Sequence, residues 1–344
     1  MPWLQFLGPM AADLDPVALI LVLVQAVFLW RVAVRAEGLR SPRLLAAAKV
    51  SRAILDDRAA ARAGERVVAI DALDPWKRQM LERLRVAYSE VGSLDDLWEP
   101  FLLRFLVATE WNESEALRRV LATGPWRRDN GAAAVRRKFV NGFKLGDHAA
   151  FVRCLDSVGV ACGHRRASDG DLLSFAHVGS FDPDTWLKSL SDDDWEDVAL
   201  HVCEYLTLQA DRLSQADRVL VRHALVLDYA NLGWRHLNPA IFFRLRPVMD
   251  HLNLYYPEFV GSATLINTPA LFVHLWAIVS PWISEGVRMR VQTADPEHTP
   301  AALAKLAPPS SLPQLYGGTC DELPNEVRAR LGYERSSIRG IYEA

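Results

Sequence analysis

The sequence contains few cysteines, and they are not arranged for a metal site. Among its 344 residues are four cysteines, Cys154, Cys162, Cys203 and Cys320, with no C-x-x-C pair. This spacing argues against a structural zinc site and against a disulfide framework. We therefore expect buried thiols in a reducing compartment, and we predict neither a metal nor a cofactor.

Common catalytic and nucleotide-binding motifs are also missing. The chain has no G-x-S-x-G, H-E-x-x-H, G-x-x-x-x-G-K-[ST] or G-x-G-x-x-G sequence. Gly142 and Gly146 have a spacing close to that of a phosphate loop, but Asp147 stands where the loop needs lysine. The nine histidines are scattered singly. We predict no catalytic residues and a protein that is not an enzyme. A net charge of -3 also argues against a general nucleic-acid binder.

A long hydrophobic run covers residues 17–34 and is interrupted by Gln25 and Arg31. Its length is roughly 27 Å at 1.5 Å per residue, close to a bilayer core of about 30 Å. Acidic residues precede it and basic residues follow it, which suits an anchor better than a cleaved signal peptide. We predict a membrane-prone segment, 1–35, with a transmembrane helix. The alternative is a helix packed on the globular part or lying in the membrane interface.

The basic stretch that follows orients this anchor. Residues 31–66 contain nine basic and four acidic residues, which places the bulk of the chain on the cytosolic side of the membrane. We interpret 36–73 as a basic helical spacer. Residues 74–131 form a helical unit by their apolar spacing, with Asn112 and Glu115 as the capped start of one helix.

The middle of the chain alternates between two periods. Four short runs have strand character: 172–178, 223–229, 262–268 and 287–292. Three helical stretches lie between or beside them: 191–213, 239–254 and 267–282. This alternation predicts an α/β fold with a mainly parallel sheet flanked by helices. The acidic run 192–197 fits the first turn of a helix, where carboxylates favour the dipole.

Five segments in order resemble the CRAL-TRIO family of lipid-binding proteins. They cover about residues 75–320: "LLRFLVATEWNESEALRRVLATGPWRRDNG" (102–131), "SDGDLLSFAHVG" (168–179), "ALVLDYANLG" (224–233), "YYPEFVGSATLINTPALFVHLWAIVSPW" (255–282) and "LPQLYGG" (312–318). The resemblance implies a helical N-terminal unit, 74–131, followed by a lipid-binding lobe, 145–320, whose sheet and helices enclose an apolar cavity. We assign no role to the C-terminal tail, 321–344.

The resemblance also implies a gate. The helix between Pro269 and Pro281 has only His274 and Ser280 as polar residues in its interior. In the family, this helix covers a cavity that holds one lipid or isoprenoid. A sixteen-carbon chain costs roughly 12 kcal/mol to expose to water at about 0.8 kcal/mol per methylene, so its carrier must be equally apolar. We predict pocket-lining gate residues at one-turn spacing: Phe272, Leu275, Trp276 and Val279.

The same resemblance indicates where a lipid head-group would lie. Glu258 of the Y-P-E run and Arg290 correspond in kind to family positions, and Thr109 follows the L-R-F-L run. Most of the basic residues that phosphatidylinositol-binding members share are replaced here, for example by Val107 and Glu110. A phosphorylated head-group needs cations to offset its burial. We therefore expect a neutral or weakly charged lipid.

Two functions remain open from the sequence. The first is a noncatalytic lipid-transfer protein that holds one lipid in a gated cavity and exchanges it with a membrane bilayer. The second is a membrane-anchored scaffold with a degenerate CRAL-TRIO lobe, which would bind partners through the acidic 182–197 surface or the basic 31–66 segment. In both, the protein is membrane-associated with its globular domain on the cytosolic side.

Overall fold

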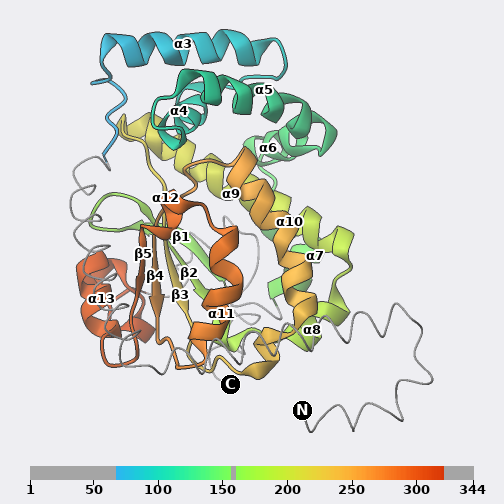
Figure 1. Ribbon diagram of the computed structural model, residues 1–344, viewed down its shortest axis with the longest axis vertical. Coiled ribbons are helices and arrows are strands. Elements are labelled where there is room, and N and C mark those ends of the chain that lie inside the picture. Colours follow the sequence, from blue (N-terminus) through green and yellow to red (C-terminus); the bar gives the residue numbers. More distant parts are fainter. Residues whose placement is uncertain (1–66, 156–159, 321–344) are drawn as a thin grey trace, which may run out of the picture. The chain divides into compact units, whose positions relative to one another are not determined.

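The computed structural model describes residues 67–155 and 160–320 (Figure 1). The predicted transmembrane helix 17–34, the predicted spacer 36–73 up to residue 66 and the tail 321–344 lie outside these residues. The described end of that spacer, 67–73, is not helical as predicted, because Ile70 is buried in the same apolar core as Leu81. Within the described ranges, no helix has both the length and the apolar character needed to cross a bilayer.

The first part of the described chain is helical. Asn112 caps α5 through a hydrogen bond that its side chain accepts from the Glu115 N–H at 3.2 Å, as predicted. Leu81, Leu102 and Val120 lie in the apolar core that α3, α4 and α5 share. The helical elements here are α3 (Pro75–Ser89), α4 (Trp98–Ala108), α5 (Glu113–Asp129), α6 (Ala132–Val140), η2 (Leu145–Asp147) and α7 (Ala149–Leu155).

A five-stranded sheet follows, with the strands in the order β1-β2-β3-β4-β5. β1 runs antiparallel to β2, and the other three pairings are parallel. The predicted α/β fold with a mainly parallel sheet is therefore confirmed, while the antiparallel strand β1 was not anticipated. The strands are β1 (Val160–Arg166), β2 (Leu172–His177), β3 (His223–Asp228), β4 (Val260–Ile266) and β5 (Val291–Thr293).

Helices cover both faces of this sheet, and α11 and α13 lie on opposite sides of the strands in Figure 1. Side chains alternate along β3, so that Ala224 and Val226 join one apolar core while Leu225 and Leu227 join another. The remaining helical elements are η3 (Val178–Ser180), α8 (Pro183–Ser189), α9 (Asp192–Asp217), η4 (Trp234–Leu237), α10 (Pro239–Tyr255), α11 (Phe272–Val279), η5 (Ser280–Trp282), α12 (Glu285–Arg288), α13 (Thr299–Leu306), η6 (Pro309–Ser311) and η7 (Gln314–Tyr316).

Two local predictions from the sequence can be compared directly with these elements. The acidic run opens α9, where Ser191 and Asp194 form a reciprocal capping box, as its helix-dipole interpretation required. The predicted strand 287–292 is largely wrong, because α12 ends at Arg288 and β5 begins at Val291. The alternating apolar residues of "VRMRV" resemble a strand, but residues 285–288 form a single helical turn.

The cysteines whose side chains the structure describes are buried, as the sequence predicted: Cys154, Cys203 and Cys320. Burial raises the pKa of Cys154 and of Cys203 to about 12, so both remain protonated at neutral pH. Cys162 lies on β1, and its side chain is not among those described.

Candidate functional site

The hydrophobic helix between the two prolines, α11, packs against the sheet. Phe272 and Leu275 are buried, at 7% and 8% exposure, while Trp276 and Val279 are half-buried. All four belong to a single apolar cluster with residues of β3 and β4, which we call the α11 layer. Val273 points away from this layer and is 53% exposed. The four predicted gate residues therefore lie together on the inner side of α11.

The floor of the α11 layer is unusual for the centre of a sheet. Leu225 and Leu227 are only half-buried, although β3 is the middle strand of five. Ala176 of β2, which pairs with Leu227, is also half-buried. On the opposite face of the same strand, Ala224 and Val226 are both 0% exposed. One face of the sheet is thus completely covered, and the other is apolar but incompletely covered.

Aromatic rings surround this half-covered floor. Tyr229 packs edge-on against Phe272 with ring centroids 4.8 Å apart, and Phe272 stacks on Trp276 at 5.9 Å. Phe242 of α10 meets Trp282 at 5.9 Å on another side. Such rings provide large apolar surfaces with few rotatable bonds. The walls of the layer are therefore apolar as well as its floor.

Two exposed aromatic residues lie on the segments beside α11. Trp234 in η4 is 73% exposed, and its ring centroid is 5.9 Å from that of His274 in α11. Phe243, next to the buried Phe242 in α10, is 76% exposed. Large exposed apolar side chains that gather near one element are typical of surfaces that bind a membrane or a partner. With Val273, these residues form what we call the apolar rim.

A buried charged group lies at the start of β4. Glu258 accepts hydrogen bonds from Arg222 at 2.6 Å and from Arg290 at 3.2 Å. Burial alone would raise the pKa of Glu258, but the two guanidinium groups outweigh it and lower the pKa. Glu258 also has a left-handed backbone, φ 51°, and its carbonyl accepts a hydrogen bond from Arg104 at 2.9 Å. These contacts hold it in a conformation that is uncommon for glutamate.

The predicted head-group residues are only partly brought together. Glu258 and Arg290 are in contact, with Arg222 as a partner that the sequence interpretation missed. Thr109 lies at the C-terminal end of α4, where its hydroxyl donates to the Phe105 carbonyl at 2.9 Å. Its side-chain bonds are therefore local to that helix end.

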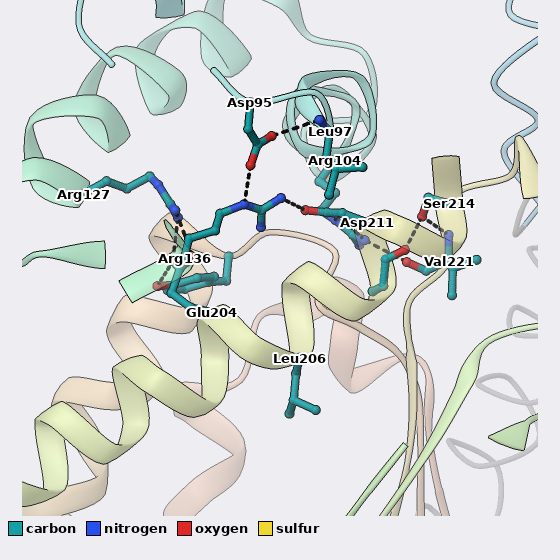
Figure 2. Close-up of polar contacts among 12 residues, drawn as sticks. Asp95, Leu97, Arg104, Arg127, Arg136, Glu204, Leu206, Asp211, Ser214 and Val221 are labelled. Carbon is teal, nitrogen blue, oxygen red and sulfur yellow. Dashed lines mark hydrogen bonds and ion pairs between the residues drawn. The ribbon is translucent and has the colours of Figure 1, made fainter. Parts of the chain in front are cut away.

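Buried ion pairs join the helical N-terminal part to α9 (Figure 2). Arg127 of α5 binds Glu204 through two hydrogen bonds of 2.7 and 2.9 Å. Asp211 accepts from Arg104 at 3.0 Å and from Arg136 at 2.9 Å. Burial lowers the pKa of Arg127, but the Glu204 carboxylate more than offsets this and raises it well above its ordinary value. We call these contacts the α9 joint.

A second polar network closes the carboxyl ends of the parallel strands. Asp228, which ends β3, accepts hydrogen bonds from Asn267 at 2.8 Å and from the Tyr316 hydroxyl at 2.9 Å. Burial raises the pKa of Asp228, but hydrogen bonds from His177, Ala230, Asn267 and Tyr316 together lower it to about 2. Asn267 follows β4 with φ 52°, a conformation that asparagine tolerates better than most residues. The network therefore fixes the point from which the chain leads into α11.

These contacts involve several of the segments on which the resemblance in the sequence depends. Arg104 comes from the L-R-F-L run, Glu258 from Y-P-E, Asn267 from I-N-x-P and Tyr316 from the closing L-P-x-x-Y-G-G run. Gly318 of that last run has no room for a side chain, since a Cβ would lie 1.9 Å from the Leu312 carbonyl oxygen. The segments are distant in sequence and meet in space.

Sequence reasoning missed part of the candidate site. Leu225 and Leu227 lie in a run that was recognised only as a strand, and the alternation of the β3 side chains was the available signal. Arg222 precedes the same strand and carried no motif signal. Its partner Glu258 is 36 residues away, so only the fold shows that they pair.

A comparison with protein families matches residues 156–318 to the family model described as the CRAL/TRIO domain. Among curated proteins, the chain is 25% identical over 265 residues to Protein real-time of Drosophila melanogaster, covering 75% of this chain and 38% of that protein. It is 21% identical over 254 residues to the Sec14 cytosolic factor of Schizosaccharomyces pombe, covering 72% of this chain and 84% of that protein.

A solved structure supports the fold independently of sequence. The crystal structure of Sfh5 superimposes with a TM-score of 0.52 at 12% identity, covering 78% of this chain and 96% of that one. At this identity the likeness concerns the fold alone. The chain spans less than two fifths of the length of the Protein real-time relatives that it matches, at 37% and 38% for the two Drosophila proteins.

Proposed function

We propose that the chain, whose residues 156–318 match the CRAL/TRIO domain family, is a lipid-binding protein of the CRAL-TRIO type that holds one apolar lipid between α11 and the sheet. In this proposal the lobe extends over residues 145–320, and α11 is a gate that opens at a membrane. Phe272, Leu275, Trp276 and Val279 line the closed site from above, and Leu225 and Leu227 line it from below. The protein acts as a carrier and not as an enzyme.

The half-covered central strand carries this proposal. Leucine side chains in the middle of a five-stranded sheet are ordinarily packed completely, because an uncovered apolar surface costs about 25 cal/mol per Å². Leu225 and Leu227 instead remain half-buried within an apolar and aromatic surrounding. A lipid chain lying on them supplies the missing cover without requiring any polar partner.

The apolar rim supports exchange with a membrane. Trp234, Phe243 and Val273 expose apolar side chains on and beside α11, where a bilayer interface would receive them. The predicted helix 17–34 would tether the domain and raise its local concentration at that surface. From the basic residues that follow this helix, we propose a location on the cytosolic side of the membrane.

The charged group at Glu258 favours a lipid with little charge. Both guanidinium groups that face Glu258, those of Arg222 and Arg290, are already paired with it. A phosphorylated head-group would have to compete with this internal carboxylate for the same cations. We therefore propose a neutral or weakly charged lipid or isoprenoid, with Arg290, whose side chain is 19% exposed, as the more accessible contact.

The alternative scaffold function gains no support from the acidic surface. Asp182 caps α8 by accepting from the Asp184 and Thr185 N–H groups. Asp194 takes part in the capping box of α9, and Asp192 pairs with Arg244 at 2.7 Å. These carboxylates stabilise helix starts, a structural use that requires no partner protein.

Lipid content tests the proposal directly. The full chain is expressed in eukaryotic cells and purified, and the extracted lipids are quantified per chain for the wild type and for Trp276→Asp. We expect about one lipid per chain in the wild type and a several-fold lower content in the variant, because a carboxylate facing the layer has no partner for its burial. Any lipid held by the N-terminal segment is common to both and cancels.

Two control variants test whether the effect is specific to the inner side of α11. Val273 lies on the outer side of the same helix, so Val273→Asp should keep the lipid while slowing its transfer to vesicles. Val86→Asp on α3, at a position of 59% exposure, should change neither. Equal lipid content in Trp276→Asp and the wild type would rule out the gate assignment, and a lipid-free wild type would favour the scaffold.

A further inference from the structure

A pocket of about 380 Å³ lies between α6, α7 and α9, and none of its lining residues belongs to α11. Its wall contains two histidines and three aspartates together with Lys138 and Arg153. It is therefore separate from the proposed lipid site in both position and chemistry.

Three of these side chains have the geometry of metal ligands. His148 Nε2 lies 2.7 Å from one carboxylate oxygen of Asp197, and His201 Nδ1 lies 3.2 Å from the other. One possible ligand atom from each residue falls within a group whose members are all within 4.8 Å of one another. The two imidazole rings are 4.3 Å apart at an angle of 68°. A small inward movement of the three side chains would bring them to one ion.

The fold rather than the local sequence creates this cluster. Asp197 and His201 are four residues apart on α9 and so share one side of that helix. His148 comes from the residue before α7, 49 positions from Asp197. His201 is almost completely buried; its Nδ1–H donates to the Asp197 carbonyl oxygen at 2.9 Å, which leaves the lone pair of Nε2 without a hydrogen-bond partner among the described residues. A buried ring nitrogen without a partner calls for a ligand or another specific explanation.

The other charged groups of the wall are already engaged. Arg153 pairs with Asp194 at 3.1 Å, and Asp147 accepts a hydrogen bond from the Lys144 N–H at 3.0 Å. The Lys138 ammonium lies 5.8 Å from the centroid of the Phe143 ring. Asp197 is thus the carboxylate of the wall that faces both imidazoles.

We propose that His148, Asp197 and His201 bind a divalent first-row transition metal such as Zn²⁺. Two imidazoles and a carboxylate are ligands that Zn²⁺ accepts readily, with water completing the coordination. Because the Phe151 N–H donates to His148 Nδ1 at 3.1 Å, the metal-free ring carries its proton on Nε2. Coordination through Nε2 therefore replaces the hydrogen bonds that His148 makes, and the ion then joins α7 to α9.

Zinc binding to the full chain, with any affinity tag removed, tests this proposal. The protein is dialysed against Zn²⁺, and bound zinc is measured by elemental mass spectrometry alongside thermal unfolding with and without Zn²⁺. His148→Asn keeps an N-cap acceptor for α7 while removing the imidazole. Asp197→Asn keeps the shape and removes the charge. His298→Asn is the matched control, because His298 and Asp295 form an exposed pair at the same 2.7 Å distance.

We expect about one zinc per chain in the wild type and in His298→Asn, and at least a tenfold weaker affinity in His148→Asn and in Asp197→Asn, as for loss of a ligand or its close support. Added zinc should raise the unfolding temperature of the wild type and of His298→Asn, and should not raise that of His148→Asn or Asp197→Asn. Zinc binding that is equal in His148→Asn and the wild type, or a folded wild type without stoichiometric zinc, overturns the proposal. Lipid content reports separately on the proposed function.

Discussion

The α9 joint and the α11 layer are held together by different kinds of contact. At the joint, guanidinium and carboxylate groups such as Arg127 and Glu204 meet at fixed distances while excluded from water. In the α11 layer, the contacts are between apolar and aromatic side chains such as Phe272 and Leu227. Breaking a buried ion pair leaves a charge without a partner, whereas apolar contacts have no required direction and can be exchanged for lipid.

From this difference we expect the α9 joint to stay closed and the α11 layer to be the boundary that opens in the proposed function. Separation at the joint would take Glu204 and Asp211, both 0% exposed, away from the arginines that neutralise their charge. Separation at the α11 layer would expose only surface that a bilayer or a lipid covers equally well. The proposed gate is built on the second type of contact, so we expect it to open at a membrane while the helical N-terminal part stays in place.

The largest effect is expected at the joint. Arg127→Met should lower the free energy of unfolding by about 3–5 kcal/mol, because it leaves the Glu204 carboxylate buried without its cation. Arg128→Met is the matched control, since this neighbour is 67% exposed and pairs only at the surface with Asp129. Its change should stay within about 0.5 kcal/mol in urea unfolding. Similar losses in both variants would show that the joint is not held by its buried ion pairs.

The next effect concerns Asp228, at the carboxyl end of β3. Asp228→Asn removes a charge that accepts several hydrogen bonds, and should cost about 2 kcal/mol at pH 7. The pKa of Asp228 is lowered from 3.8 to about 2 in the folded protein. Its contribution is therefore complete above pH 3.8 and is lost as the pH falls towards 2.

Urea unfolding of the wild type and Asp228→Asn between pH 2 and pH 7 checks this sign. The difference in unfolding free energy should be constant above about pH 5 and shrink below pH 4. Asp295→Asn serves as the surface control, because hydrogen bonds from His298 also lower the pKa of Asp295, whose side chain is 53% exposed. A difference for Asp228→Asn that grows on acidification contradicts the assignment.

A smaller effect distinguishes the two faces of β3. In lipid-free protein, Val226→Ala should cost about 2 kcal/mol, from roughly 0.8 kcal/mol per methyl group plus a cavity. Leu227→Ala removes more carbon but should cost only about 1 kcal/mol, because its side chain is only half-buried. Chemical unfolding of the two variants measures this. A loss of 3 kcal/mol or more for Leu227→Ala would mean that the layer is completely packed.

The sequence predicted the fold class and the strands that carry period-two apolar patterns, because both depend on local side-chain order. It also placed the four gate residues on one helix, where one-turn spacing determines which of them share a side. It could not reveal Arg222 beside Glu258 or His148 beside Asp197, since each pair forms only when distant segments pack. The strand β1 was missed because it has no strong periodic pattern, and the single turn of α12 was missed because the alternating apolar residues around it resemble a strand.

The smallest effect is expected for Arg290→Met, which removes one of the two arginines that pair with Glu258. Glu258 keeps Arg222 at 2.6 Å, so the carboxylate is not left without a cation. Stability should fall by about 1 kcal/mol or less, as for a partly exposed pair. If the lipid is neutral, its amount per chain should stay within about twofold of the wild type, since the binding free energy then comes from apolar contact. A selective loss of one charged lipid class in extracts of this variant would instead identify Arg290 as a head-group contact, and the preference for a neutral lipid would be wrong.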